Sequence, residues 1–330
     1  MDIVVVDAVE DIDTLTAAHG IEVIAHDRDY HGLPADPIEE LRPVLKDAPK
    51  AGEHHMVRLG RVDGEPVGMF HLRMPTLDNL SSINVQLVVH PDQRRKGYGR
   101  QLLDAALGEA ARLGRTRVFL TAGSPLGSIE GPAASMLRAV GAKPALADVR
   151  RLLDVAAATP AARPECPAQG YRVVRWVDRA PEEFLDDLAR LTVGMSTDPP
   201  LGELDYEPEV WDAHRYRERE QLSLDQQRIR FATGVVHEES GTMVAMTDLG
   251  VSALRHEVAY QWDTIVSKEH RGHRLGLTIK AWNLEQVIER LPEVRYVNTW
   301  NAAENAHMIA INDALGFRPV DSWTEWQLDR

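Results

Sequence analysis

The sequence contains a single cysteine, Cys166, among 330 residues. No disulfide can therefore form within the chain, which excludes a disulfide-stabilised scaffold. Pro164 and Pro167 flank this cysteine in a stretch without regular hydrophobic spacing, where nothing nearby would stabilise a thiolate. We therefore expect no cysteine chemistry.

Positive charge is also in short supply. The 37 lysines and arginines are outnumbered by 51 acidic residues, so the net charge is −14 and the pI is near 5.4. This balance disfavours proteins that bind nucleic acid or anionic membranes through a cationic surface. The N-terminal segment MDIVVVDAVEDIDTL lacks the basic start of a signal peptide, and no segment is long and apolar enough to span a bilayer. We expect a cytoplasmic protein with no nucleic-acid or membrane partner.

Two common glycine-rich motifs are missing as well. No GxGxxG follows the first predicted strand, and no GK followed by Ser or Thr occurs. These absences exclude the dinucleotide-binding fingerprint and the nucleoside-triphosphate loop.

What the chain does have is the length and composition of two globular domains. It is 44% hydrophobic and 27% charged, and 330 residues exceed what one hydrophobic core usually organises. Alanine and proline supply nine of the thirteen residues of the segment AAATPAARPECPA. Such a stretch is typical of a linker. We therefore predict an N-terminal domain over 1–155, a linker over 156–168 and a C-terminal domain over 169–330.

The two predicted domains repeat one pattern. Arg94 and Arg271 begin matching Arg/Gly-rich segments 177 residues apart, and Gly141 and Gly316 lie in matching helix ends 175 residues apart. Two landmarks at nearly the same spacing indicate a duplicated fold.

Each half shows the same order of strands. Asp63-Gly64 and Ser240-Gly241 are typical of hairpin turns between two strands. The segment 83–89 is apolar and rich in β-branched residues, which predicts a strand buried on both faces. The run 259–266 takes the same place in the second half.

Helices follow from the apolar spacing. Ile12–His19 is predicted as a short helix ended by Gly20, and a longer helix runs from Gly99 to Gly114. Helical insertions are predicted over 36–48 and 207–222. In the second half, the long helix carries an apolar stripe of Leu277, Ala281, Leu284, Ile288 and Leu291.

The segment RRKGYG between a strand and a helix has the properties of an anion site. Free backbone N–H groups at a helix start point toward an anion, and the helix dipole adds about half a positive charge there. Glycine permits close approach of the backbone, and arginine supplies forked donors to phosphate oxygens. Arg94, Gly97 and Gly99 are spaced for binding a pyrophosphate.

These residues resemble the signature of the GNAT superfamily of acyl-CoA N-acyltransferases, Gln/Arg-x-x-Gly-x-Gly/Ala between the fourth strand and the third helix. Residues 94–99 match it in full, and residues 271–276 match except that Arg274 replaces the middle glycine. The resemblance covers both halves and implies an α/β (α+β) fold of two tandem GNAT domains. Each would be a mixed, mostly antiparallel sheet flanked by helices. The tandem layout and length are similar to those of mycothiol synthase.

The resemblance implies that acetyl-CoA is the cofactor and that a substrate amine attacks its thioester directly. In such folds, two splayed strands admit the pantetheine arm. The implied cofactor contacts are Val88, Val89, Arg94, Arg95, Lys96, Gly97, Tyr98, Gly99 and Arg100 in the first half. In the second half they are Ile265, Val266, Arg271, Gly272, His273, Arg274, Leu275, Gly276, Leu277, Asn301 and Asn305.

The candidate catalytic residues lie in the segment EVAYQWDTIV. Asp263 is an acid inside an apolar strand, and burial would suit it to act as a base; the alternatives are a hydrogen bond to a neighbouring strand or a solvent-facing position. Glu257 is a weaker rival, and Tyr260 either relays a proton or packs in the core. Asn301 and Asn305 are alternatively turn and cap residues.

A general acid is harder to find. GNAT enzymes often place a tyrosine four residues before the glycine that ends the last helix, but Asn312 and Leu137 occupy those positions. His307 is a possible substitute, although an exposed helix histidine is the commoner outcome.

The sequence thus predicts an N-acetyltransferase, monomeric or homodimeric, that acts on the primary amine of a small molecule and has its chemistry in the second domain. The first domain would be a second active site or a degenerate copy. A noncatalytic acyl-CoA-binding regulator and a protein N-acetyltransferase are the alternatives. No metal site is predicted.

Overall fold

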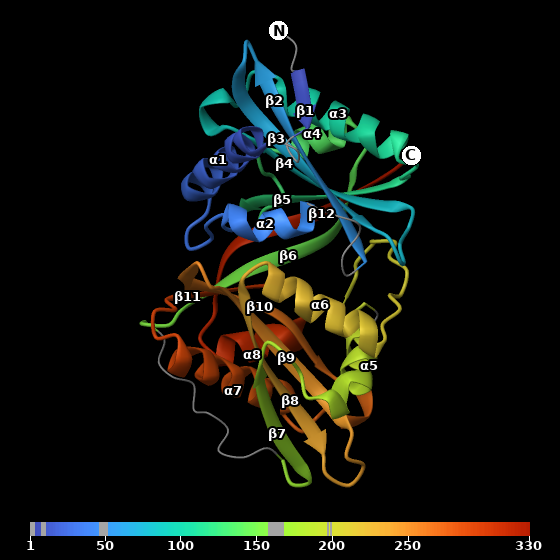
Figure 1. The fold of residues 1–330 in the computed structure, drawn as a ribbon, viewed down its shortest axis with the longest axis vertical. Coiled ribbons are helices and arrows are strands. Elements are labelled where there is room, and N and C mark those ends of the chain that lie inside the picture. Colours follow the sequence, from blue (N-terminus) through green and yellow to red (C-terminus); the bar gives the residue numbers. More distant parts are fainter. Residues whose placement is uncertain (1–3, 8–10, 46–51, 158–167, 197, 199) are drawn as a thin grey trace. The chain divides into compact units, whose positions relative to one another are not determined.

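The computed structural model describes residues 4–7, 11–45, 52–157, 168–196, 198 and 200–330. Most of the predicted linker, including Cys166, lies outside these residues. The chain forms two compact units, each a mostly antiparallel sheet flanked by helices, as predicted (Figure 1). None of the helices in the described ranges is both long and apolar enough to cross a membrane.

The first unit contains residues 1–147, 202–204 and 322–330. Its strands follow the order β1-β2-β3-β4-β5-β12. They are β1 (Val4–Asp7), β2 (Glu53–Val62), β3 (Glu65–Pro75), β4 (Ser82–Val89), β5 (Arg117–Pro125) and, from Ser322 on, β12 (Arg318–Asp329). Its helices are α1 (Ile12–Asp29), α2 (Ile38–Leu45), α3 (Tyr98–Arg112) and α4 (Ala134–Ala139).

The second unit contains residues 148–201 and 205–321, with the strand order β6-β11-β10-β9-β8-β7. Its strands are β6 (Lys143–Asp154, from Asp148 on), β7 (Tyr171–Val177), β8 (Arg228–His237), β9 (Met243–Ser252), β10 (Arg255–Val266) and β11 (Tyr296–Ala302). Its helices are α5 (Leu185–Met195), α6 (Ala213–Asp225), α7 (Leu275–Arg290) and α8 (Ala306–Ala314).

The two halves of the sequence do not supply the two units separately. Residues 322–330, from the end of the chain, complete the first sheet beside β5, and residues 148–154 complete the second sheet beside β11. Each unit therefore depends on a strand from the other half of the sequence.

The predicted hairpins form where the turn dipeptides lie. Asp63 and Gly64 both adopt positive φ, 52° and 86°, between β2 and β3. This is the geometry of a two-residue turn that matches strand twist. Gly241, with φ of 71°, lies in the turn between β8 and β9.

One predicted helix end is wrong. α1 continues through Gly20 to Asp29, because Ile21 and Ala25 are buried beyond the glycine and reward the extra turns. A glycine inside a helix costs only about 1 kcal/mol, which this burial outweighs. Asp11 caps its start by accepting from the N–H groups of Asp13 and Thr14.

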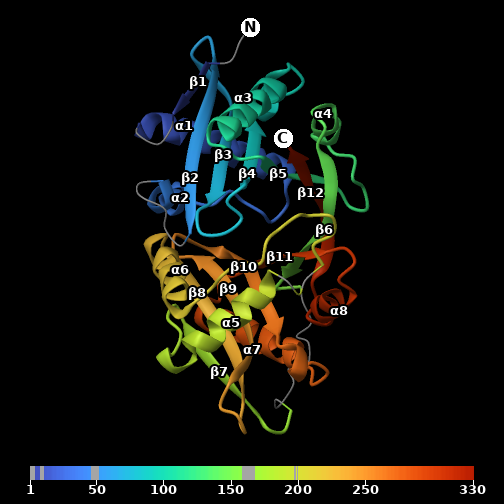
Figure 2. The same ribbon diagram turned by 90° about the vertical axis from the view of Figure 1, so that its right-hand side faces the viewer.

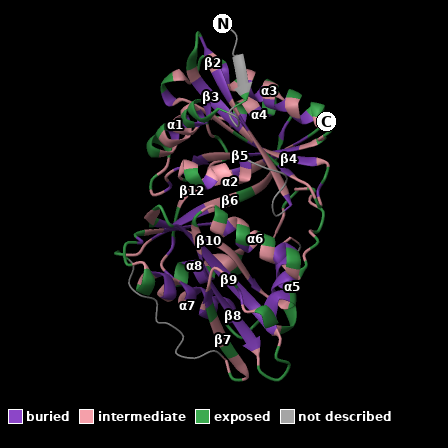
Figure 3. Cartoon of the chain, in the orientation of Figure 1, coloured by how far each residue is buried: buried purple, intermediate pink, exposed green. Residues whose placement is uncertain are grey.

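In both units, helices cover the two faces of the sheet. In the first unit, α1 packs with Leu59 and Met69 on one face, while Leu103 of α3 packs with Leu72 on the other. In the second, α5 and α6 lie on one face and α7 on the other (Figure 2). β9 is buried along its whole length (Figure 3).

The face of α7 that is most deeply buried differs from the predicted apolar stripe. The stripe residues are only partly buried, whereas Asn283 and Gln286 are fully covered. Asn283 accepts a hydrogen bond from Thr233 and donates to the carbonyl of Phe231. These partners lie about 50 residues away and explain why polar residues are buried there.

Lys280 lies on the same buried face of α7. It is 2% exposed, its Nζ lies 5.6 Å from the centre of the Phe317 ring, and burial lowers its pKa to about 7. The pKa of Lys280 is lower in the folded state than in the unfolded state, so burying this lysine costs free energy at pH 7. The cost disappears as the pH rises toward about 10.4, the ordinary pKa of lysine.

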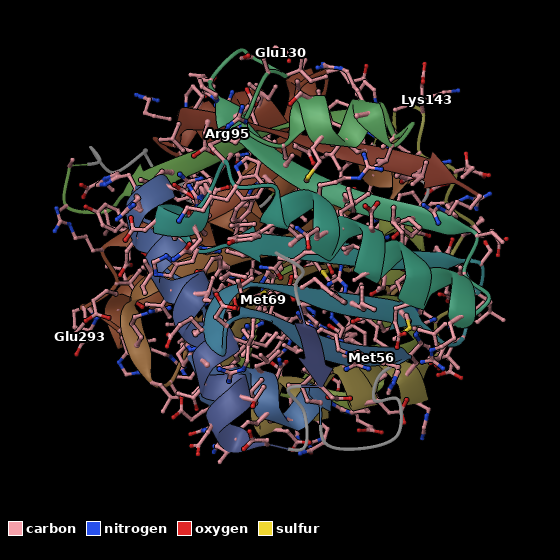
Figure 4. All side chains as sticks on the ribbon, turned by 90° about the horizontal axis from the view of Figure 1, so that it is seen from above. Met56, Met69, Arg95, Glu130, Lys143 and Glu293 are labelled. Carbon is pink, nitrogen blue, oxygen red and sulfur yellow. The ribbon has the colours of Figure 1, made fainter. Side chains whose placement is uncertain are left out.

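We therefore expect Lys280→Met to raise the free energy of unfolding at pH 7 by about 4 kcal/mol, and by much less at pH 10. Urea unfolding at both pH values measures this. Lys143→Met, at an exposed position (Figure 4), is the matched control and should show no such pH-dependent gain. Equal gains at both pH values would contradict the prediction.

Candidate active site

The loop between β4 and α3 presents an open helix start. Arg95, labelled in Figure 4, and Gly97 take left-handed backbone conformations with φ of 65° and 86°. Among the described residues, no side chain caps the N-terminus of α3. A Cβ placed on Gly97 would have no atom within 4 Å. The first N–H groups of α3 are thus free for an anion, and the glycine leaves room for it.

The second loop has the same backbone shape. Gly272 and Arg274, with φ of 87° and 58°, take the positions that Arg95 and Gly97 take in the first loop. Both loops therefore have left-handed residues at the same two positions, but the glycine is at the second of them in the first loop and at the first of them in the second loop. A left-handed non-glycine residue costs about 1 kcal/mol. Arg274 consequently departs from the motif in sequence but not in backbone geometry.

The sequence predicts that the first arginine of each loop donates to phosphate, but in the structure it binds a carboxylate and a strand carbonyl instead. Arg94 binds Asp29 through both terminal nitrogens, at 2.9 and 2.6 Å, and donates from Nε to the carbonyl of Val89 at 3.3 Å. Arg271 binds Asp198 at 2.6 Å and donates to the carbonyl of Val266 at 3.1 Å. Both guanidinium groups therefore hold the loop against its strand, and the anion donors are backbone N–H groups.

We expect Arg271→Ala to weaken acetyl-CoA binding to the second loop about tenfold, because a loop that has lost its clamp must be ordered on binding. Calorimetry in a Gly97→Glu background, where the first loop is blocked, measures this. Arg290→Ala, at the exposed end of α7, is the control. Unchanged affinity for Arg271→Ala would rule out the clamp role.

Several predicted cofactor residues have buried side chains. Tyr98 packs with Val62 and Val67, and Leu275 packs with Val235. Only their backbone can face a cofactor. Arg94 is partly buried, and the other side chains of the two loops are exposed, namely Arg95, Lys96, Arg100, Arg271, His273 and Arg274. Gly99, Val88 and Leu277 are partly buried, and Gly276 is buried.

The strands before both loops separate from their parallel neighbours. β4 pairs with β5 only as far as Val85 and Leu120, and among the described strands none pairs on that edge with its remaining residues to Val89. This opening explains why β4 is not buried on both faces along its whole length, contrary to the sequence prediction. β10 pairs with β11 only as far as Tyr260 and Asn298.

The free strand edges lie next to the loops. The carbonyls of Val89 and Val266 accept from the clamping arginines. The N–H of a strand residue faces the same edge as its carbonyl, so the N–H groups of Val89 and Val266 also face the opening. Ile265, beside Val266, is buried against the α5 face of the sheet. An extended amide-bearing ligand can add to such an edge as a further strand.

Asp263 lies in a β-bulge at this opening. The pairing of β10 with β9 shifts between Gln261 and Thr264, so β10 carries an extra residue there. The described pairing of β3 with β4 in the first unit has no such shift. The Asp263 carboxylate is partly exposed and accepts from Arg219 at 2.8 Å.

A buried polar network holds this bulge. The N–H of Asp263 donates to Oδ1 of Asp248 at 2.9 Å, and Nε of Arg230 donates to the other oxygen at 2.6 Å. Arg230 also donates to Tyr216 at 3.1 Å. Burial raises the pKa of Asp248 despite the opposing attraction of Arg230. Asp263 is thereby fixed in position and still reaches solvent.

Asp248, Arg230 and Arg219 are not among the site residues that the sequence predicts. The available signal was Asp248 itself, a carboxylate inside the apolar segment MVAMTDLGVS, but its partners lie on β8 and α6.

Glu257 and Tyr260 are not brought together with the loop. Glu257 is exposed and lies nine residues before Val266 on β10, which is about 30 Å along a strand. Tyr260 is partly buried at the last pair between β10 and β11. Of the three catalytic candidates, only Asp263 is near the second loop.

The asparagines near the end of the chain have structural partners. Asn305 caps α8 by accepting from the N–H of Met308 at 3.1 Å. Asn301 accepts from Nδ2 of Asn312 at 2.5 Å, and Oδ1 of the buried Asn312 meets no partner among the described residues. His307 is exposed. The position where a tyrosine acid is usual thus holds a buried amide.

The loops, the separated strands and the sheet order match a known family. Its model, the acetyltransferase (GNAT) family, matches residues 21–128. The structure is similar to that of a tandem GNAT protein from the clavulanic acid biosynthesis pathway, solved without acetyl-CoA. The two are 30% identical, with a TM-score of 0.85 over 99% of this chain and 98% of that chain. The chain belongs to the GNAT family.

More distant GNAT structures share the fold alone. A GCN5-related N-acetyltransferase from Sphaerobacter thermophilus is 15% identical, with a TM-score of 0.67 over 98% of this chain and 95% of that chain. A GNAT acetyltransferase from Colwellia psychrerythraea is 11% identical, with a TM-score of 0.57 over 100% of both chains. No curated protein matches the sequence.

As a GNAT protein with this tandem architecture, the chain is an N-acetyltransferase. Enzymes of this family generally use acetyl-CoA. The loops fit its pyrophosphate, since both present uncapped helix starts with an exposed glycine beside them.

Proposed function

We propose that this GNAT enzyme transfers the acetyl group of acetyl-CoA to the primary amine of a small molecule, and that the second unit carries out this chemistry. The observation that supports the proposal most is the bulge in β10. It places a solvent-reaching carboxylate, Asp263, where β10 leaves β11 and three residues before the strand end at Val266.

The residues of the second unit have separate tasks in this proposal. Acetyl-CoA, when bound, supplies an activated acetyl thioester. The N-terminus of α7 binds the pyrophosphate, and the N–H of Val266 binds the pantetheine arm. Asp263 attracts the substrate ammonium and accepts its proton, which is necessary because an alkyl ammonium has a pKa of about 10 and cannot attack while protonated.

The network around Asp263 supports a role in positioning the substrate. Arg219 binds one carboxylate oxygen, and Asp248 holds the N–H. The charge of Asp263 is therefore kept in one place, which favours an incoming cation over a neutral molecule.

Release of free thiol from acetyl-CoA tests the proposal with a panel of ethanolamine, benzylamine, tyramine and glucosamine. We expect turnover with at least one amine and none with the corresponding alcohols. Saturable acetyl-CoA binding without turnover on any amine, or on peptides with a free lysine, would favour the noncatalytic alternative. Turnover on peptides alone would favour a protein N-acetyltransferase.

A further inference from the structure

Within the described part of the first unit, one carboxylate forms no ion pair. Glu325 on β12 is partly buried and accepts a hydrogen bond from Oγ1 of Thr121 at 3.0 Å. No lysine, arginine or histidine among the described residues forms an ion pair with it. The charge of Arg73 attracts the Glu325 carboxylate without contacting it, and the ion pair of Arg73 is with Glu53, at 3.7 Å. A partly buried carboxylate in this state favours a cationic ligand.

Glu325 lies at the opening between β4 and β5. Thr121 directly follows Leu120, the last residue of β5 that pairs with β4. Trp326 on β12 faces the core on the α3 side, so Glu325, its neighbour along the strand, faces the opposite side, which α1 covers. Glu325 and Thr121 thus lie on the α1 side of the sheet, where the strand edge becomes free.

Aromatic side chains line the same face. Trp323 lies two residues before Glu325, and Tyr30 at the end of α1 stacks on it with ring centres 5.1 Å apart. The Tyr30 hydroxyl lies against Gly123, where an added Cβ would approach it to 2.8 Å. Gly123 and Thr121 share one face of β5, two residues apart. A carboxylate beside aromatic rings is a common arrangement for binding alkylammonium groups.

We propose that Glu325, Thr121, Tyr30 and Trp323 form a second amine site, in which the first unit binds an alkylammonium group and Glu325 takes its proton. The proposal rests on the acetyltransferase function proposed above. One ammonium proton moves to Glu325 and frees the nitrogen lone pair. The nitrogen then bonds to the acetyl carbon while the carbon–sulfur bond breaks toward sulfur. A second proton from nitrogen neutralises the thiolate, and Glu325 returns its proton to water.

The charged groups around Glu325 determine its titration. Burial raises the pKa of Glu325, while the hydrogen bond from Thr121 on β5 and the charge of Arg73 on β3 oppose that rise. A base accepts a proton only when it is deprotonated. The activity therefore rises as the pH increases through the pKa of the base, and it is low at pH values below that pKa. The site therefore predicts a low-pH limb in the rate profile of the first unit.

The test isolates the first unit by blocking the second loop with Gly272→Glu. In this background, we expect benzylamine or tyramine to release thiol from acetyl-CoA. Glu325→Gln should lower kcat/KM for the amine at least 100-fold and remove the low-pH limb, with unchanged affinity for acetyl-CoA. Glu325→Asp should restore the limb and part of the rate, which a merely structural role would not produce. Thr121→Val should cause a smaller loss.

Glu130→Gln is the matched control, because Glu130 projects from the outside of the same unit (Figure 4) and pairs with Arg138 at 2.6 Å. It should leave all parameters unchanged. Turnover in the Gly272→Glu background that is insensitive to Glu325→Gln would overturn the amine site. No turnover in that background, while the Gly97→Glu variant remains active, would also overturn the amine site and leave the proposed function standing. Inactivity of all variants and of the unaltered protein would overturn both.

Discussion

Gly97→Glu is expected to abolish acetyl-CoA binding to the first unit. The variant should take up one equivalent less of acetyl-CoA than the unaltered protein, or bind the first-site equivalent at least about 100-fold more weakly, which is ~2.7 kcal/mol. A Cβ at this position meets nothing within 4 Å, so the new side chain enters the open space before α3. A carboxylate there repels a diphosphate and competes for the free N–H groups.

The backbone strain of this substitution can be separated from its effect on the anion. Gly97 has φ of 86°, a conformation that disfavours any other residue. Gly64 also has φ of 86° and an open Cβ position, but lies in the β2–β3 turn. Gly64→Glu thus introduces the same strain and charge away from the loop. It should lower stability to a similar extent and keep full binding stoichiometry in calorimetry. If Gly64→Glu also lost one equivalent, the anion-site interpretation would fail.

Local patterns predicted the parts of the fold that local forces determine. The hairpin at Asp63-Gly64 formed as expected because its conformation is set by the two turn residues themselves. The duplicated Arg/Gly loops were likewise visible in sequence and have matching backbones. Gly20 failed as a stop signal because the burial of residues further along α1 outweighs a local preference.

The exchange of terminal strands between the units could not be predicted from the sequence. The alternation of residues in β12 shows which face is buried, for instance at Trp326, but carries no information about the neighbouring strand. Glu325 was missed for the same reason, because Thr121 lies 204 residues away in the chain.

The candidate site was predicted in part. Asp263 was selected because an acid inside an apolar strand is unusual, but its partners come from β9 and α6. The catalytic role predicted for Glu257 is not supported by its position at the far end of β10. The arginines of the loops were assigned to phosphate, whereas the acids that bind them, Asp29 and Asp198, carry no motif.

Asp263→Asn is expected to lower kcat of the second unit about 10²–10³-fold at pH 7, measured by thiol release in the Gly97→Glu background. Asparagine keeps the size of the side chain and an oxygen that accepts from Arg219, so the fold and the affinity for acetyl-CoA should be kept. What is lost is the proton acceptor and the charge that attracts an ammonium. Glu289→Gln, at an exposed position on α7, is the control for removing one negative charge.

Stability measurements decide between a carboxylate that acts on the substrate and a purely structural one. If Asp263 acts on the substrate, the rate falls while the melting temperature is unchanged. If Asp263 only anchors Arg219, the melting temperature falls, and Arg219→Gln reproduces the same loss of rate. An exposed ion pair is worth about 0.2–1 kcal/mol, and this one is partly buried. Loss of such a pair cannot account for a 10²–10³-fold decrease, which corresponds to about 3–4 kcal/mol. A decrease of that size with unchanged stability therefore requires that Asp263 acts on the substrate, as a proton acceptor or through its charge.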